Sequence, residues 1–187
     1  MGTLVIIIVA VVLLPVIFVV ATYNSLVTLR NLVKNSWANI DTELRRRYDL
    51  IPNLVETVKG YAAHERTVLE TVTEARARAV ASTGSPASQA RDENKLVQAL
   101  NGLFAVSERY PQLKAADNFL KLQQELVDTE DRIQAARRFY NGNVKDLNTR
   151  CEMFPSNLIA SWFSFSHAEY FEVDSLDVRA PVTVSFR

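Results

Sequence analysis

The chain has 187 residues, and its 21 Lys and Arg are balanced by 21 Asp and Glu, so the formal net charge is zero. Because a neutral chain lacks the basic excess that holds polyanions, we expect no nucleic acid partner. Only five glycines and six prolines occur, and Ala, Leu, Glu and Arg are plentiful, so composition favours helices over sheets.

The first segment is apolar. Leu4 to Ala21 gives eighteen residues without a charge, which as a helix span about 27 Å, close to the thickness of the hydrocarbon core. Pro15 is tolerated in a membrane helix and can kink it. A cleavable signal peptide would have a basic region before a shorter apolar core, but no Lys or Arg precedes Arg30. We therefore predict an uncleaved transmembrane helix over residues 4–22, rather than a signal peptide or a buried core helix.

The charges beside this span indicate its orientation. Arg30 and Lys34 follow the span, whereas residues 1–3 offer only the terminal amine. Basic residues stay on the cytoplasmic side of a membrane helix. We expect a single-pass protein of the inner (cytoplasmic) membrane, with residues 1–3 as a short external tip and the body in the cytoplasm.

Helical periodicity continues directly after the span, with apolar residues at steps of three and four from Leu26 to Tyr48. We expect this first helix to end near Asp49, because Pro52 disfavours helical geometry at Ile51 and suits the start of a new helix. The second helix then runs to the loop Ser82–Pro86.

Two further helices are predicted. One runs from about Gln89 to Arg109 and ends at Tyr110-Pro111, and the next follows the apolar face from Phe119 to Cys151 and ends at Phe154-Pro155. About four long helices joined by short turns pack antiparallel, so we predict an all-α fold in which residues 23–154 form an elongated antiparallel bundle.

Residues 155–187 differ from the bundle. Leu158, Trp162, Phe163 and Phe165 crowd together after a Pro-Ser-Asn sequence that can cap a short amphipathic helix. If the chain reverses three times, the first time at Pro52, this segment returns to the bilayer surface, where Trp and Phe are favoured. The alternatives are that it caps the open end of the bundle or contacts another copy.

The tail alternates apolar and polar residues, around Tyr170–Val173 and again at Val182, Val184 and Phe186, as strands do. Two short strands alone are marginal, so they need a helix surface or strands from another copy. We therefore predict a homo-oligomer.

No motif supports catalysis or metal binding. His64-Glu65 begins like a zinc-protease signature, but Val68 stands where the second histidine is required. Cys151, the single cysteine, falls on an apolar helix face, which indicates a buried and inert thiol. We expect no catalytic residue, metal or cofactor, and no enzyme.

The densest charge run is Arg45, Arg46 and Arg47. A lipid headgroup site is disfavoured, because Arg45 lies 24 residues beyond Ala21, about 36 Å of helix and several Debye lengths. We expect ion pairs or solvation, and a partner-binding patch is the alternative. The candidate acidic partners are Asp41, Asp49, Glu125, Asp128, Glu130 and Asp131.

Five separated blocks resemble the bacterial LemA family. They are Tyr23–Val27, Arg45–Val55, Asn118–Gln123, Arg138–Asn141 and Phe154–Ala160, and the resemblance that they mark extends over nearly the whole chain. The resemblance implies one N-terminal transmembrane helix, a small outward tip and a long helical bundle, and it supplies no catalytic residues. It also implies two leads, since some relatives are associated with a membrane metalloprotease of the HtpX kind and one branch with membrane invagination in magnetosome formation.

Our first hypothesis is a self-associating scaffold that organises the membrane and partner membrane proteins. The alternative is an adaptor or regulator of an HtpX-like membrane protease, which would use exposed bundle faces for docking. Enzymatic activity has the least support, because no convergent set of acid, base, nucleophile or metal ligands exists.

Overall fold

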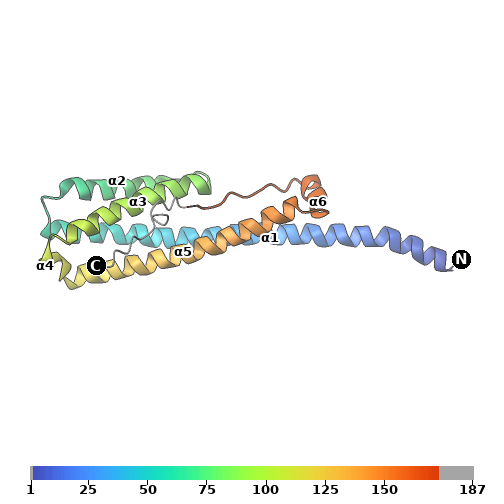
Figure 1. The fold of residues 1–187 in the computed structure, drawn as a ribbon, viewed down its shortest axis with the longest axis horizontal. Coiled ribbons are helices and arrows are strands. Elements are labelled where there is room, and N and C mark those ends of the chain that lie inside the picture. The colour runs from blue at the N-terminus through green and yellow to red at the C-terminus, as the bar shows by residue number, and fades with distance from the viewer. Residues whose placement is uncertain (1, 173–187) are drawn as a thin grey trace, which may run out of the picture. The chain divides into compact units, whose positions relative to one another are not determined.

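The computed structural model describes residues 2–172, except for the side chains of residues 5–8. It contains the helices α1 (Gly2–Tyr61), α2 (Arg66–Ala81), α3 (Pro86–Ser107), α4 (Pro111–Lys114), α5 (Asp117–Glu152) and α6 (Ser156–Trp162), shown in Figure 1. Residues 2–172 include no β-strand, and the predicted all-α fold with a long apolar N-terminal helix is confirmed. Most of the predicted strand region, from Val173 onward, lies outside the described residues.

The predicted helix end near Asp49 is wrong, because α1 passes through Pro52 and ends at Tyr61. Pro52 has no backbone N–H for the carbonyl oxygen of Tyr48, four residues earlier. The Arg76 side chain of α2 supplies the missing donor, with its Nε atom 2.7 Å from that oxygen. The helix therefore continues without an unsatisfied carbonyl, and the first reversal occurs ten residues later.

That reversal is a tight turn between α1 and α2. The Ala62 amide donates to the Val58 carbonyl at 2.8 Å, and the Glu65 amide donates to the Ala62 carbonyl at 3.0 Å. The Glu65 carboxylate then binds the side chains of Arg109 at 2.9 Å and Tyr110 at 3.2 Å. This turn is consequently fixed to the end of α3.

The chain divides into two compact units. Among the described residues, unit 1 comprises residues 2–46 and 129–170, and unit 2 comprises residues 47–128 together with residues 171 and 172. Both α1 and α5 contribute to each unit, because the boundaries fall inside these helices.

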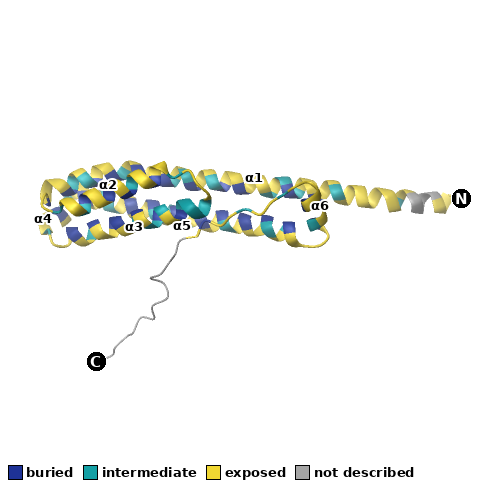
Figure 2. Cartoon of the chain, turned by 90° about the horizontal axis from the view of Figure 1, so that it is seen from above, coloured by how far each residue is buried: buried dark blue, intermediate teal, exposed yellow. Residues whose placement is uncertain are grey.

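Unit 2 is built on the antiparallel pair α2 and α3, which the short loop 82–85 joins. Apolar side chains spaced by three and four residues on each helix meet in its core, and Figure 2 shows these buried positions along the inner faces. They include Ile51, Leu54 and Val58 of α1, Leu69 and Val72 of α2, Leu96 and Leu103 of α3, and Phe119 of α5.

Unit 1 is an antiparallel pairing of α1 with α5. Arg132 binds Glu43 at 3.0 Å, and further along both helices the rings of Tyr140 and Trp37 lie 5.4 Å apart. The residue number of the partner on α1 decreases as the residue number on α5 increases, so the two helices run antiparallel. The core includes Leu26, Val33, Ile40 and Leu44 of α1 and Ile133, Tyr140, Val144 and Leu147 of α5.

The N-terminal part of α1 extends from unit 1 without a packing partner in the described chain. It is the one helix in residues 2–172 that is long and apolar enough to cross a membrane, and none of its most apolar eighteen-residue window is buried. Leu4 is 63% exposed, Leu14 is 66% exposed and Ile17 is 61% exposed. Such a surface is costly in water and favourable in lipid, so this segment fits a membrane anchor.

Candidate functional site

The segment that follows α5 forms a compact corner at the end of unit 1. The Ser156 hydroxyl lies 2.7 Å from the Arg150 carbonyl and 2.8 Å from the Met153 carbonyl, and it satisfies acceptors at the C-terminus of α5. The short helix α6, which has seven residues, then buries Ile159 and Ala160 in unit 1. Its opposite face presents Leu158 and Trp162, which are 61% and 79% exposed.

An aromatic cluster joins this corner to α1. The Tyr23 ring lies 4.8 Å from the Phe163 ring and 5.8 Å from the Phe165 ring, measured between centroids. Trp162 stacks on Phe163 at 6.0 Å, and the Arg30 guanidinium lies over the Phe165 ring, 5.1 Å from its centroid. Because Tyr23 follows Ala21 by only two residues, the cluster lies where the apolar part of α1 ends.

The outer surface of the corner carries no charge and is mostly apolar, with Ser161 and Ser164 as exposed polar residues. Residues 153–165 include no Asp, Glu, Lys or Arg. We call its exposed apolar side chains the apolar tip, and they are Met153, Phe154, Leu158, Trp162 and Phe163. Of the four residues that the sequence singled out here, Leu158, Trp162 and Phe163 are exposed in the tip, and Phe165 is half-buried beneath Arg30.

The chain after the tip is held along α5. The Asn148 side chain forms two hydrogen bonds with the backbone of Ala168, at 2.8 and 3.0 Å. The Tyr140 hydroxyl donates to the Glu169 carbonyl at 2.8 Å, and His167 lies 3.0 Å from the Glu152 carboxylate. Burial, together with the nearby negative charge of Glu169, raises the pKa of Tyr140 to about 12. Contacts therefore hold the tip in two places. Tyr23 packs against Phe163 and Phe165, and Asn148 and Tyr140 bind the chain that follows the tip.

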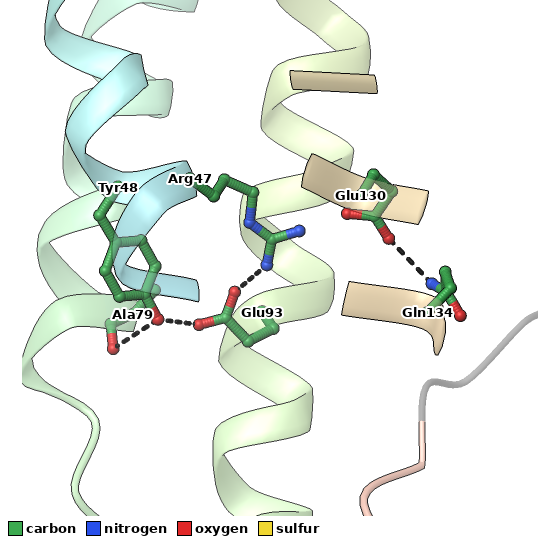
Figure 3. Close-up of polar contacts among 6 residues, drawn as sticks. All are labelled: Arg47, Tyr48, Ala79, Glu93, Glu130 and Gln134. Atoms are coloured by element: carbon green, nitrogen blue, oxygen red, sulfur yellow. Dashed lines mark hydrogen bonds and ion pairs between the residues drawn. The ribbon is translucent and has the colours of Figure 1, made fainter. Parts of the chain in front are cut away.

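The three consecutive arginines do not share one surface. Arg45 is exposed and pairs with Asp41 at 3.0 Å, and Arg46 is exposed as well. Arg47 points into unit 2, where it binds the buried Glu93 carboxylate. Figure 3 shows this carboxylate bound by both Arg47 and Tyr48.

Sequence reasoning did not find Glu93, since its partner lies 46 residues away on another helix. Among the acidic residues considered as partners, Glu130 accepts a hydrogen bond from Gln134 at 2.8 Å, as Figure 3 also shows. Asp128 accepts one from Gln124 at 2.8 Å. Tyr23 and Asn148 were missed for the same reason, because their roles depend on which parts of the chain fold together.

The residues considered for chemistry have structural surroundings. Within residues 2–172 no three His, Cys, Asp or Glu side chains are grouped so that they could hold a metal ion. Cys151 is buried, and burial raises the pKa of its thiol, with Glu152 contributing in the same direction. A raised pKa keeps the thiol protonated and weakly nucleophilic at neutral pH.

A surface hollow between α2 and α3 in unit 2 contains charged side chains that pair with one another. Arg78 pairs with Glu74 at 3.7 Å, and Lys95 pairs with Asp92 at 3.3 Å. The Ser82 hydroxyl lies 2.9 Å from Asp92 and lowers the pKa of that carboxyl. These contacts account for the hollow as part of helix packing.

Comparison with known proteins gives matches over most of the chain. The model of the LemA family matches residues 36–186. The magnetosome protein MamQ 2 of Paramagnetospirillum magneticum is 28% identical over an alignment of 175 residues, and the match covers 80% of this chain and 64% of that protein. MamQ of Magnetospirillum gryphiswaldense is 27% identical over 174 residues, with the same coverage of 80% and 64%.

A protein named LemA, from Metamycoplasma hominis, is 26% identical over an alignment of 167 residues, and the match covers 83% of this chain and 75% of that protein. The matches to the MamQ proteins thus span slightly less than two thirds of the length of those relatives.

Proposed function

Because the chain belongs to the LemA family, we propose that it is a membrane-anchored, non-catalytic scaffold that associates with further copies of itself. In this role it organises the membrane around its anchors and offers its helices to other membrane proteins. The names of the MamQ relatives describe them as magnetosome proteins, which fits a component of an assembly.

One observation carries the proposal, namely that a single helix is both the candidate membrane span and a core element of the body. α1 runs from Gly2 to Tyr61 without interruption and buries Leu26, Ile40 and Leu54 on the way. A protein that needed only to be kept at the membrane could use a flexible linker. A continuous helix instead transmits the orientation of the anchor to the packed residues beyond it.

The proposed location is the inner membrane, with the body in the cytoplasm. Arg30 and Lys34 follow the span and favour the cytoplasmic side. Protease added to intact spheroplasts should leave the body uncut, whereas permeabilised spheroplasts should lose it. Digestion in the intact spheroplasts contradicts this orientation.

Self-association is tested with two copies of the full chain that carry different affinity tags. The copies are co-expressed, extracted in mild detergent and purified through one tag. We expect the second tag to be recovered, and native mass analysis to give a defined multiple of the 21.1 kDa chain plus its tags. Copies mixed only after extraction form the control, because exchange in detergent would otherwise imitate association.

The same purification separates the scaffold from the adaptor hypothesis. Recovery of a foreign membrane protein in fixed stoichiometry with a single copy of this chain would support the adaptor and contradict self-association. A chain that purifies alone as a monomer contradicts both.

A further inference from the structure

We propose that the apolar tip inserts into the interfacial layer of the same bilayer that holds α1. This makes Met153, Phe154, Leu158, Trp162 and Phe163 a second membrane contact within unit 1. The inference rests on the membrane anchoring in the proposed function, and it does not depend on self-association.

The position of the tip along α1 is the first argument. At 1.5 Å per residue, Tyr23 lies only about 3 Å beyond Ala21, where the charge-free stretch of α1 closes. Each interfacial layer of a bilayer is about 5 to 8 Å thick, so Tyr23 falls inside it. The ring contacts of Tyr23 with Phe163 and Phe165 hold the tip at this same level.

The chemistry of the tip is the second argument. Trp162 is 79% exposed and Phe154 is 78% exposed, and no charged residue occurs between Met153 and Phe165. Exposing these side chains to water is unfavourable, whereas tryptophan and phenylalanine are favoured at the headgroup level. Arg30 lies nine residues beyond Ala21, about 13 Å, which is outside this layer, and its long side chain can extend back toward lipid phosphates.

The packing of α6 is the third argument. Ile159 and Ala160 already fill the contact between α6 and unit 1, so Leu158 and Trp162 remain on the opposite face. Both views of the chain show α6 beside α1 at the point where the N-terminal part of α1 continues alone (Figures 1 and 2). The exposed face of α6 therefore lies at the level along α1 where the exposed apolar part of α1 ends.

Tryptophan fluorescence tests the insertion directly, because the chain has two tryptophans. Full-length protein with Trp37→Phe keeps only Trp162, and it is reconstituted in phosphatidylcholine vesicles that contain phosphatidylglycerol. We expect acyl chains brominated near the headgroup to lower Trp162 emission roughly twofold relative to unbrominated lipid, since the indole lies beside them. Aqueous iodide should quench it weakly.

The matched control is Trp162→Phe, which keeps only Trp37. Trp37 lies sixteen residues beyond Ala21, about 24 Å along α1, so brominated lipid should leave its emission unchanged. A third protein, Trp37→Phe with Leu158→Glu, places a charge in the exposed face. It should keep its helical circular dichroism, because Leu158 is 61% exposed, and lose most of the quenching by brominated lipid.

Equal quenching of Trp162 and Trp37 by brominated lipid overturns the proposal. A second result also overturns it. In that result Trp162 is protected from iodide but is not quenched by brominated lipid, and the protection is lost when the vesicles are diluted with empty lipid. Such protection comes from contact with a second copy of the chain. Flotation of the same vesicles reports the anchor separately. Protein that floats without Trp162 quenching refutes only the tip, whereas protein that stays at the bottom refutes the anchor itself.

Discussion

The buried contact of Arg47 and Tyr48 with Glu93 is the most demanding feature at the level of single residues. Arg47 and Glu93 are 2% and 4% exposed. A charge that is taken out of water loses several kcal/mol of hydration free energy, and the interactions with its partners must offset this loss. The contact joins α1 to α3 and fixes their register in unit 2.

Removing the acid from this contact should be costly. Glu93→Ala removes the buried carboxylate that both the Arg47 guanidinium and the Tyr48 hydroxyl bind, and we expect the free energy of unfolding to fall by about 3 kcal/mol or more. Urea denaturation of the detergent-solubilised protein, followed by circular dichroism, measures this change.

Two control variants show whether the decrease in the free energy of unfolding comes from the buried charge. Asp41→Ala breaks the exposed pair with Arg45, and its cost should stay below about 0.5 kcal/mol. The double variant Arg47→Met with Glu93→Leu removes both charges and should cost less than Glu93→Ala alone. An equal cost for Glu93→Ala and Asp41→Ala contradicts the role assigned to the buried pair.

Tyr140 makes stability depend on pH in the alkaline range. Its pKa rises from 10.0 to about 12 on folding, chiefly because the phenol is buried. Below pH 10 the phenol is neutral in both states and its stabilising contribution is complete. Between pH 10 and 12 the unfolded chain releases the proton first, so the stability falls as pH rises, by about 2 to 3 kcal/mol.

The variant Tyr140→Phe isolates this effect from other groups that titrate at high pH. The native chain should lose about 2 to 3 kcal/mol more than the variant between pH 10 and 12. Below pH 10 the variant should be less stable, because it lacks the hydrogen bond to Glu169. Parallel losses in the two proteins would show that the phenol of Tyr140 ionises normally in the folded state.

At the scale of helices, the continuity of α1 depends on a contact between two helices. Arg76 of α2 donates to the Tyr48 carbonyl, which Pro52 leaves without its usual amide donor. We expect Arg76→Ala to lower the free energy of unfolding by about 1 to 2 kcal/mol, since a hydrogen bond from a charged donor is lost.

A double-mutant cycle with Pro52→Ala tests this explanation. Alanine at position 52 restores the backbone donor, so Arg76→Ala should cost much less in that background than in the native chain. The coupling free energy of the two changes, from urea denaturation of the four proteins, should be about 1 kcal/mol. An equal cost of Arg76→Ala in both backgrounds refutes the link between Arg76 and the path of α1 through Pro52.

The sequence predicted the positions of some helices correctly, but it did not predict the contact between Arg76 and Tyr48. Local apolar periodicity predicted helices over residues 89–109 and 119–151, and the structure has α3 at Pro86–Ser107 and α5 at Asp117–Glu152. The first reversal was placed wrongly at Pro52, because local rules cannot anticipate a donor from Arg76. The chain nevertheless still reverses three times, since the true turn follows at residues 62–65.

For the candidate site, the sequence identified the residues but did not predict their contacts. Composition alone identified Leu158, Trp162, Phe163 and Phe165, since apolar residues crowd there without charge. The contacts of Phe163 and Phe165 with Tyr23 depend on the antiparallel return of α5 along α1, and the sequence indicates that return only through the number of chain reversals. Membrane insertion of these residues stays a prediction.

At the scale of the whole molecule, the proposed protein has two contacts with one bilayer, the N-terminal part of α1 and the apolar tip. Both belong to unit 1. A helix that crosses the membrane and is then packed against α5 cannot bend freely at the surface. Copies that associate through their bodies would therefore impose a common orientation on their anchors, which is how a scaffold can organise a membrane.

The central claim is that one uninterrupted helix joins the anchor to the body, and a distance along α1 in a bilayer tests it most directly. Spin labels at Val20→Cys and Thr42→Cys, both exposed positions, are introduced into the full chain with Cys151→Ser and measured by pulsed electron resonance in lipid nanodiscs. The 22 residues between them predict a narrow distribution centred at about 33 Å. A broad distribution with a shorter mean would show that a flexible segment separates the anchor from the body, and would contradict the claim.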